Sequence, residues 1–161
     1  MDISGSYIFN ASPERVWEML MDPDEISSCI PGCNRFVPDG EDRYKVVLTV
    51  GMAAITGTYD GSVTLTDRVP NTSYRLIAEG QGRPGFVKGS SLIVLRADGS
   101  TTVVDVTGTV EAGGAIARFG QRLLGGVAKT MLDRFFACLQ TKITVRAGTL
   151  AGSSDPARSP V

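Results

Sequence analysis

The chain has 161 residues and a net charge of −1, which suggests a single domain large enough to bury a substantial core. A hydrophobic content of 42% and a charged content of 20% are typical of a soluble globular protein. No segment approaches the roughly 18 consecutive apolar residues of a membrane-spanning helix, and the start lacks the basic and apolar regions of a signal peptide. We therefore expect a cytoplasmic protein, or one that binds peripherally to the inner face of the membrane.

The chain contains no histidine, and this excludes several kinds of chemistry. Ser-His-Asp and Cys-His arrangements cannot form, and the commonest acid or base at neutral pH is missing. Cys29 and Cys33 are spaced as C-x3-C without a second ligand pair, so no metal site is predicted. In a chain without a signal peptide, the three cysteines are expected to be reduced thiols. We predict a protein that is not an enzyme and that has no covalently bound cofactor.

The first third of the chain predicts one strand and two short helices. Apolar residues alternate over residues 2–10, as in a half-buried strand. Ser12 followed by Pro13 is typical of a helix start, and Asp22 followed by proline is typical of a second start. The second helix is expected to end in a hydrophobic corner before a Pro-Gly turn at residues 31–32.

From residue 44 onward the apolar pattern changes to period two, which predicts an antiparallel meander of strands joined by short turns.

Residues 80–85 match the pattern G-x-G-x-x-G, but a further strand is predicted after them where a nucleotide site needs a helix. Nucleotide binding is therefore not predicted. A pI near 5.4, with no basic run interleaved with aromatic residues, does not favour nucleic acid either.

The last ordered segment is predicted to be one helix over residues 115–146, because apolar residues recur at three- and four-residue steps. Residues 147–161 are rich in Gly, Ser, Pro and Ala and are expected to form a disordered tail after a domain that covers residues 1–146. Bases outnumber acids on the helix, which predicts either a surface for an anionic partner or membrane, or a solvated face. The bases assigned to this surface are Arg118, Arg122 and Lys129.

Small residues occupy inward strand positions where a packed core would carry Val, Ile or Leu. Glycine weakens a strand, so its presence there needs a reason. The small side chains either leave a cavity between the sheet and the helix, or allow the sheet to curve round the helix, and the two explanations are compatible. The positions are Gly57, Gly61, Ala78, Gly80, Gly89, Ser91 and Gly108.

Several segments resemble the family of the carbon monoxide dehydrogenase G subunit, and their order and spacing cover about residues 3 to 143. The resemblance implies an α+β helix-grip (START-like) fold, in which a curved antiparallel sheet of about seven strands wraps a long C-terminal helix. It further implies an accessory protein of a molybdenum hydroxylase that carries a quinone or links the enzyme to the membrane. The matching segments are Val16-Trp17-Glu18, residues 22–33, residues 85–89, residues 118–124 and Phe135-Phe136.

An apolar cavity would accept a quinone with its isoprenoid tail, a fatty acyl chain or a polyketide. The alternatives to a quinone carrier are a generic lipid- or polyketide-binding protein, including a cyclase, and an interaction or assembly factor with a filled core. The predicted ligand-binding residues are Trp17, Ile30, Pro31, Tyr59, Gly61, Gly89, Phe119, Leu123, Val127, Met131 and Phe135.

Overall fold

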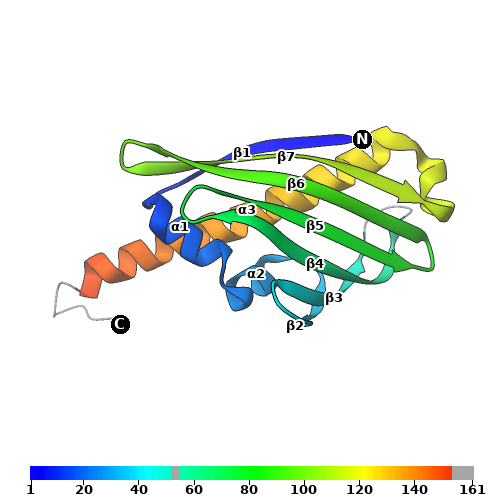
Figure 1. The fold of residues 1–161 in the computed structure, drawn as a ribbon, viewed down its shortest axis with the longest axis horizontal. Coiled ribbons are helices and arrows are strands. Elements are labelled where there is room, and N and C mark those ends of the chain that lie inside the picture. The colour runs from blue at the N-terminus through cyan, green and yellow to red at the C-terminus, as the bar shows by residue number, and fades with distance from the viewer. Residues whose placement is uncertain (52–54, 154–161) are drawn as a thin grey trace.

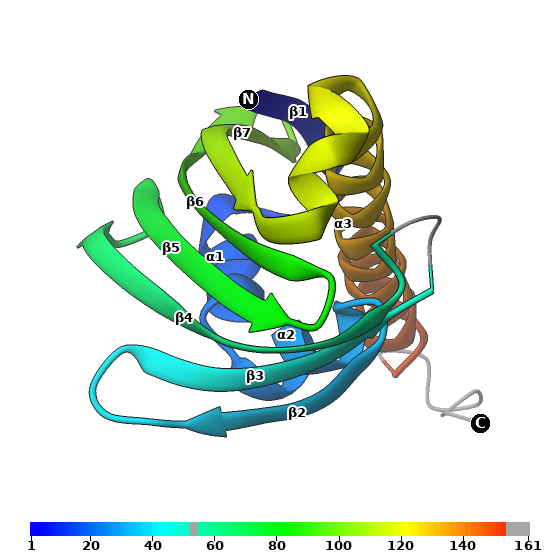
Figure 2. The ribbon, with the colours of Figure 1, turned by 90° about the vertical axis from the view of Figure 1, so that its right-hand side faces the viewer.

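Seven antiparallel strands form one sheet that curves round the long helix α3, as Figures 1 and 2 show from two directions. The computed structural model describes the backbone of residues 1–51 and 55–153, and side chains through residue 144. The strand order is β1-β7-β6-β5-β4-β3-β2, so the meander closes back on the N-terminal strand. The elements are β1 (Asp2–Phe9), α1 (Pro13–Leu20), α2 (Pro23–Cys29), β2 (Cys33–Pro38), β3 (Arg43–Val50), β4 (Gly57–Val69), β5 (Ser73–Gly82), β6 (Gly85–Asp98), β7 (Thr101–Gly113), the 3₁₀ helix η2 (Gly114–Phe119) and α3 (Gly120–Ser153).

The two short helices begin where the sequence predicts. The Ser12 hydroxyl accepts a hydrogen bond from the Arg15 amide at the start of α1, and the Asp22 carboxylate accepts one from the Asp24 amide at the start of α2. The helices lie at one end of the sheet beside α3 (Figure 1). They join a core made mainly by β1, the inner face of the sheet and the C-terminal half of α3. Its most enclosed side chains include Phe9, Val16, Val104 and Leu139.

The sheet curves because glycines allow neighbouring backbones to approach closely. A Cβ atom on Gly61 would collide with the backbone carbonyl oxygen of Glu79, and one on Gly108 would collide with that of Ser90. Gly80 differs, since a Cβ atom at that position would have the Asp60 carbonyl oxygen as its nearest neighbour, at 3.6 Å. Curvature therefore explains Gly61 and Gly108, whereas Gly80 has room for a side chain.

A pair of alanine substitutions tests this distinction. We expect Gly61→Ala to lower the free energy of unfolding by about 1–3 kcal/mol, because a backbone strand cannot move aside cheaply. Gly80→Ala should stay within about 1 kcal/mol of the wild type, since its methyl group meets only ordinary contacts. Urea denaturation followed by circular dichroism measures both values. Equal losses at the two positions would contradict the close-approach explanation.

The C-terminal helical segment is not the single helix predicted over residues 115–146. The chain first forms the 3₁₀ helix η2, and α3 begins only at Gly120, which has a φ of +79°. Glycine adopts this left-handed conformation without the cost that a Cβ imposes, so it separates the two helices and changes the phase of the apolar residues. Consequently Leu124 is buried, whereas Leu123 is 38% exposed.

The other end of α3 also differs from the expected boundary at residue 146. The helix continues to Ser153, because extending an existing helix costs much less than starting one. The remainder of the predicted tail, residues 154–161, lies outside the described residues.

The expectation of three reduced thiols is wrong for two of them, because Cys29 and Cys138 form a disulfide. Cys29 is the last residue of α2, and Cys138 faces it from α3 with the Cα atoms 5.4 Å apart. Their sequence separation is 109 residues, so the pairing could not be predicted from the local spacing of the cysteines. Lys142 of α3 also binds Ser28 and pairs with Glu25 at 3.7 Å, so α2 is attached to α3 at several points. Cys33 stays a free thiol.

Removing the disulfide should destabilise the domain. Cross-linking residues so far apart restricts the unfolded chain, and we expect Cys29→Ala/Cys138→Ala to lower the free energy of unfolding by about 2–5 kcal/mol. Cys33→Ser is the control, with an expected change within about 1 kcal/mol. Guanidinium denaturation under non-reducing conditions gives both values, and an unchanged midpoint in the double variant would contradict a structural role for the bond.

Candidate functional site

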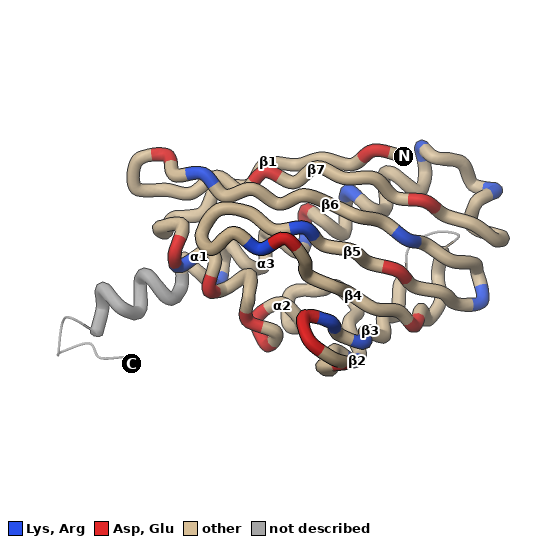
Figure 3. Tube along the Cα trace, in the orientation of Figure 1, with Lys and Arg blue, Asp and Glu red and all other residues tan. Residues whose placement is uncertain are grey.

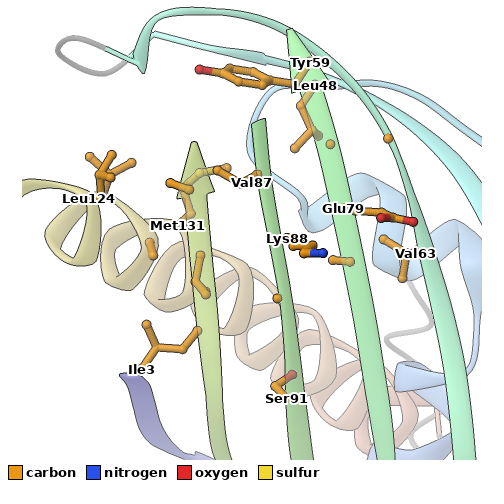
Figure 4. A pocket seen from close by; sticks show the side chains of 18 of the residues that line it. Ile3, Leu48, Tyr59, Val63, Glu79, Val87, Lys88, Ser91, Leu124 and Met131 are labelled. Carbon is orange, nitrogen blue, oxygen red and sulfur yellow. The ribbon is translucent and has the colours of Figure 1, made fainter. Parts of the chain in front are cut away.

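Two adjoining cavities lie between the concave face of the sheet and α3. The first, of about 300 Å³, lies beside η2 and the start of α3, and we call it the η2-side chamber. Figure 4 shows Leu124 and Met131 on α3, opposite Leu48 and Tyr59 on the strands. The residues that define the chamber from the sheet and helices include Leu48, Val50, Tyr59, Gly61, Val87, Gly89, Ile116, Leu124, Val127 and Met131.

The second cavity, of about 340 Å³, lies beside α1 and α2, and we call it the α2-side chamber. The two chambers are neighbours, because seven residues line both of them. Each falls within the range of about 300–1,000 Å³ found for small-molecule sites. The shared residues are Ile3, Val63, Leu76, Ala78, Ser91, Ala128 and Met131.

The α2-side chamber has a markedly apolar lining. None of the described residues that line it is Asp, Glu, Lys or Arg. Its walls are formed by aliphatic and aromatic side chains from α1, α2, α3 and the sheet, with Tyr44, Tyr74 and Ser91 as hydroxyl-bearing members. In the η2-side chamber, the two lining residues with charged side chains, Glu79 and Lys88, are exposed. A molecule in these chambers would therefore be bound chiefly by removal of its apolar surface from water.

The structure brings most of the predicted ligand-binding residues together around the chambers. Tyr59, Gly61, Gly89 and Val127 line the η2-side chamber, and Met131 lines both. The α2-side chamber includes Ile30, Pro31 and Phe135 in its wall. The small inward residues Ala78 and Ser91 stand at the junction, so part of the small-residue pattern does correspond to open space.

Three of the predicted ligand-binding residues do not line either chamber. Phe119 and Leu123 are 46% and 38% exposed, because the break at Gly120 rotates them away from the sheet. Trp17 packs into the core instead, where its ring meets Tyr74 edge to face at a centroid distance of 5.7 Å. We leave Phe119 and Leu123 out of the site, and Trp17 contributes through its contact with Tyr74.

Sequence reasoning missed several lining residues. Met1 and Ile3 reach the cavities because β1 pairs with β7 and lies next to α3. Phe36 and Tyr44 stack on one another at 4.7 Å and line the α2-side chamber from β2 and β3. Leu124 was missed for a different reason, since a continuous helix would have placed Leu123 inside. The Gly-Gly pair at 113–114 and Gly120 are the sequence signal for that break.

The basic residues assigned to a partner surface fall into two groups. Arg118 and Arg122 are exposed one turn apart, on η2 and α3 respectively, and neither has a hydrogen bond or ion pair within the part of the chain that is described. No acid occurs between residues 112 and 132, and Figure 3 shows basic positions at this end of the molecule. Lys129 is different, because it pairs with Asp133 at 2.9 Å.

Lys129 belongs to a small polar cluster with Tyr7 and Asp133. The Tyr7 hydroxyl donates to Asp133 at 2.7 Å, and Lys129 donates to the Tyr7 oxygen at 3.4 Å. Burial, followed by the bond to Asp133, raises the pKa of Tyr7, whereas hydrogen bonds from Tyr7 and Lys129 lower the pKa of Asp133. The cluster ties β1 to α3 outside the cavities, which indicates a structural role for Lys129.

Metal and membrane-spanning sites find no support in the described residues. Within residues 1–51 and 55–153, no three His, Cys, Asp or Glu side chains gather in a way that would hold a metal ion. In the same part of the chain, no helix is both long and apolar enough to cross a membrane.

Comparison with known proteins agrees with this geometry. The family model for the carbon monoxide dehydrogenase G subunit (CoxG) matches residues 5–144. The chain belongs to the CoxG family. CoxG is an accessory subunit family, and the resemblance seen in the sequence is confirmed. No curated protein matches the sequence.

Several solved structures are similar to this chain over most of its length. A conserved protein from Geobacillus kaustophilus is 40% identical, with a TM-score of 0.86, and the match covers 89% of this chain and 95% of that one. Protein Ms6760 from Mycobacterium smegmatis is 16% identical, with a TM-score of 0.67 and coverage of 90% and 92%. MLL2253 from Mesorhizobium loti is 17% identical, with a TM-score of 0.63 and coverage of 91% and 98%. The last two share the fold alone.

Proposed function

We propose that this CoxG-family protein is a non-catalytic carrier that binds a quinone or a similar apolar molecule in its two chambers. The observation that carries the proposal is the pair of adjoining cavities, one of which has no charged residue in its described lining. A protein that served only as a scaffold would gain stability from filling this space, because packed interiors contain few voids of such size. The open volume therefore supports a binding role.

The balance of interactions favours a ligand with a long apolar tail. Each buried methylene group contributes about 0.8 kcal/mol, whereas one neutral hydrogen bond adds about 1 kcal/mol. Five or six methylene groups would outweigh the hydrogen bonds of a small polar head. The tail would therefore set the affinity, and the head would set the orientation of the ligand.

Membership of the CoxG family supports a place for the protein beside a molybdenum hydroxylase of the aerobic carbon monoxide dehydrogenase type. In this proposal the hydroxylase reduces the carried quinone, and the carrier links the enzyme to the respiratory chain at the cytoplasmic membrane face. The unpaired Arg118 and Arg122 would contact anionic lipid or the hydroxylase. Lys129 is already engaged by Asp133, so we assign it no part in that contact.

Extraction of the protein from its native host tests the carried ligand. We expect organic extraction followed by mass spectrometry to recover a quinone in stoichiometric amount. Recovery of acyl lipids or aromatic polyketides would support a generic lipid- or polyketide-binding protein instead. Recovery of nothing would indicate an assembly factor.

Val127→Trp should abolish retention of the ligand by filling the η2-side chamber. The matched control, Phe119→Trp, changes an exposed position and should retain the ligand.

Vesicle binding tests the contact with lipid. Because each arginine near an anionic bilayer contributes about 1 kcal/mol, Arg118→Glu/Arg122→Glu should weaken binding to phosphatidylglycerol-containing vesicles by at least about tenfold. The matched control is Arg35→Glu/Lys45→Glu, which reverses two exposed charges on β2 and β3. Co-sedimentation of the full chain measures both. Equal weakening in the two variants, or no vesicle binding by the wild type, would overturn the lipid contact and leave the carrier proposal standing.

A further inference from the structure

The four tyrosine hydroxyls of the chain differ in how they are used. The Tyr7 hydroxyl donates to Asp133 at 2.7 Å, and the Tyr59 hydroxyl donates to the Ile55 carbonyl oxygen at 2.7 Å. Within the described part of the chain, the hydroxyls of Tyr44 and Tyr74 have no hydrogen-bond partner. Both of these residues line the α2-side chamber. Tyr44 is half-buried, so water can reach it, whereas Tyr74 is only 3% exposed.

A buried hydroxyl without a partner costs free energy, so Tyr74 needs an explanation. Its oxygen is not among the fully enclosed polar atoms that lack a partner within the described residues, so the oxygen keeps some accessible surface. Burial raises the pKa of Tyr74, and the group therefore remains a neutral donor at physiological pH. The chamber thus contains a neutral hydrogen-bond donor ready for a ligand.

Ser91 provides a second hydroxyl of the same kind. It is 8% exposed, it lines both chambers, and its oxygen has no partner among the described residues. Figure 4 shows Ser91 on β6, and Gly108 of β7 lies between it and Ile3 of β1 in the sheet register. Ser91 pairs with Leu76 across the sheet, whereas Tyr74 pairs with Ile93, so the two residues are diagonal neighbours on one face. Such neighbours have backbones about 7–8 Å apart, a distance that an aromatic side chain can span, so the two side chains belong to the same part of the chamber wall.

The chemistry of the walls limits what these hydroxyls can bind. A carboxylate in the α2-side chamber would be a buried charge, and no described lining residue is a cation that could pair with it. The cation whose charge reaches Tyr74, Arg68, is exposed and already pairs with Asp42 at 2.9 Å. A neutral carbonyl oxygen accepts a hydrogen bond without this cost. The hydroxyl pair therefore favours a head group with uncharged oxygens over a fatty acid.

We propose that Tyr74 and Ser91 form a head-group seat, in which the neutral oxygen-bearing ring of the ligand lies in the α2-side chamber and its apolar tail extends through the η2-side chamber. The seat rests on the proposed function as a carrier. A hydroxyl both donates and accepts hydrogen bonds, so the same pair binds a ring carbonyl as a donor and the corresponding ring hydroxyl as an acceptor. The seat thus accommodates both the oxidised and the reduced ligand.

The single tryptophan of the chain reports on this arrangement. Trp17 contacts the Tyr74 ring at a centroid distance of 5.7 Å, so a ring bound at the seat lies close to the indole. Decylubiquinone, a quinone with a ten-carbon tail, is a suitable probe because quinones quench indole fluorescence at short range. We expect saturable quenching of Trp17 in the full chain. Decylbenzene, which has the same tail without oxygens, is the comparison ligand and is measured by competition.

Conservative substitutions then test the two hydroxyls. Tyr74→Phe and Ser91→Ala should each weaken decylubiquinone binding by about fivefold and leave decylbenzene binding unchanged, because each removes one neutral hydrogen bond. The matched control is Tyr7→Phe, which loses a hydroxyl outside both chambers and should bind decylubiquinone within about twofold of the wild type. Because no described residue depends on either hydroxyl, the variants should fold normally, and circular dichroism checks this.

The outcomes separate the seat from the carrier proposal. Binding of decylubiquinone that calorimetry detects without quenching of Trp17, or equal affinity in wild type, Tyr74→Phe and Ser91→Ala, would overturn the seat and leave the carrier intact. A parallel loss of both probes in the variants would also overturn it, since a purely structural role predicts that result. Failure of the wild type to bind either probe would contradict the carrier function itself.

Discussion

The close approach of adjacent strands at Gly61 and Gly108 is the constraint on which the rest of the structure depends. At each position the backbone carbonyl of the next strand occupies the place of a side chain, and this permits the sheet to curve round α3. The curvature separates the middle of the sheet from the helix, while the ends of the sheet pack against α1, α2 and η2. Two chambers remain between these contacts. The glycines thus determine both the shape of the fold and the presence of a site.

Much of this architecture follows from short-range patterns in the sequence. Period-two alternation predicted the strands, the caps at Ser12 and Asp22 predicted the short helices, and the small inward residues raised the question of a cavity. The pattern offered curvature and open space as compatible explanations. The structure shows both: Gly61 allows a close approach of strands and also lines the η2-side chamber, whereas Gly80 lines it with room for a side chain. The difference depends on the backbone of the neighbouring strand and not on residue type.

Other features depend on contacts between distant residues and escaped sequence reasoning. The Cys29–Cys138 disulfide joins segments 109 residues apart. It could be predicted only from the contact between α2 and α3, which the sequence does not reveal. The lining residues at the start of α3 were misassigned because a positive φ at Gly120 shifts the helical phase. The unpaired hydroxyl of Tyr74 could be recognised only once the partners of the other tyrosines were known.

The charge-free lining of the α2-side chamber has a consequence for the quinone carriage proposed above. A ring that gained a lone electron there would become an anion in a medium of low polarity, with no cation among the described lining residues to balance it. Uptake of electrons together with protons avoids that penalty, since the product stays neutral. In the carrier proposal, the chamber would therefore disfavour the radical anion of its cargo, and electrons would enter together with protons.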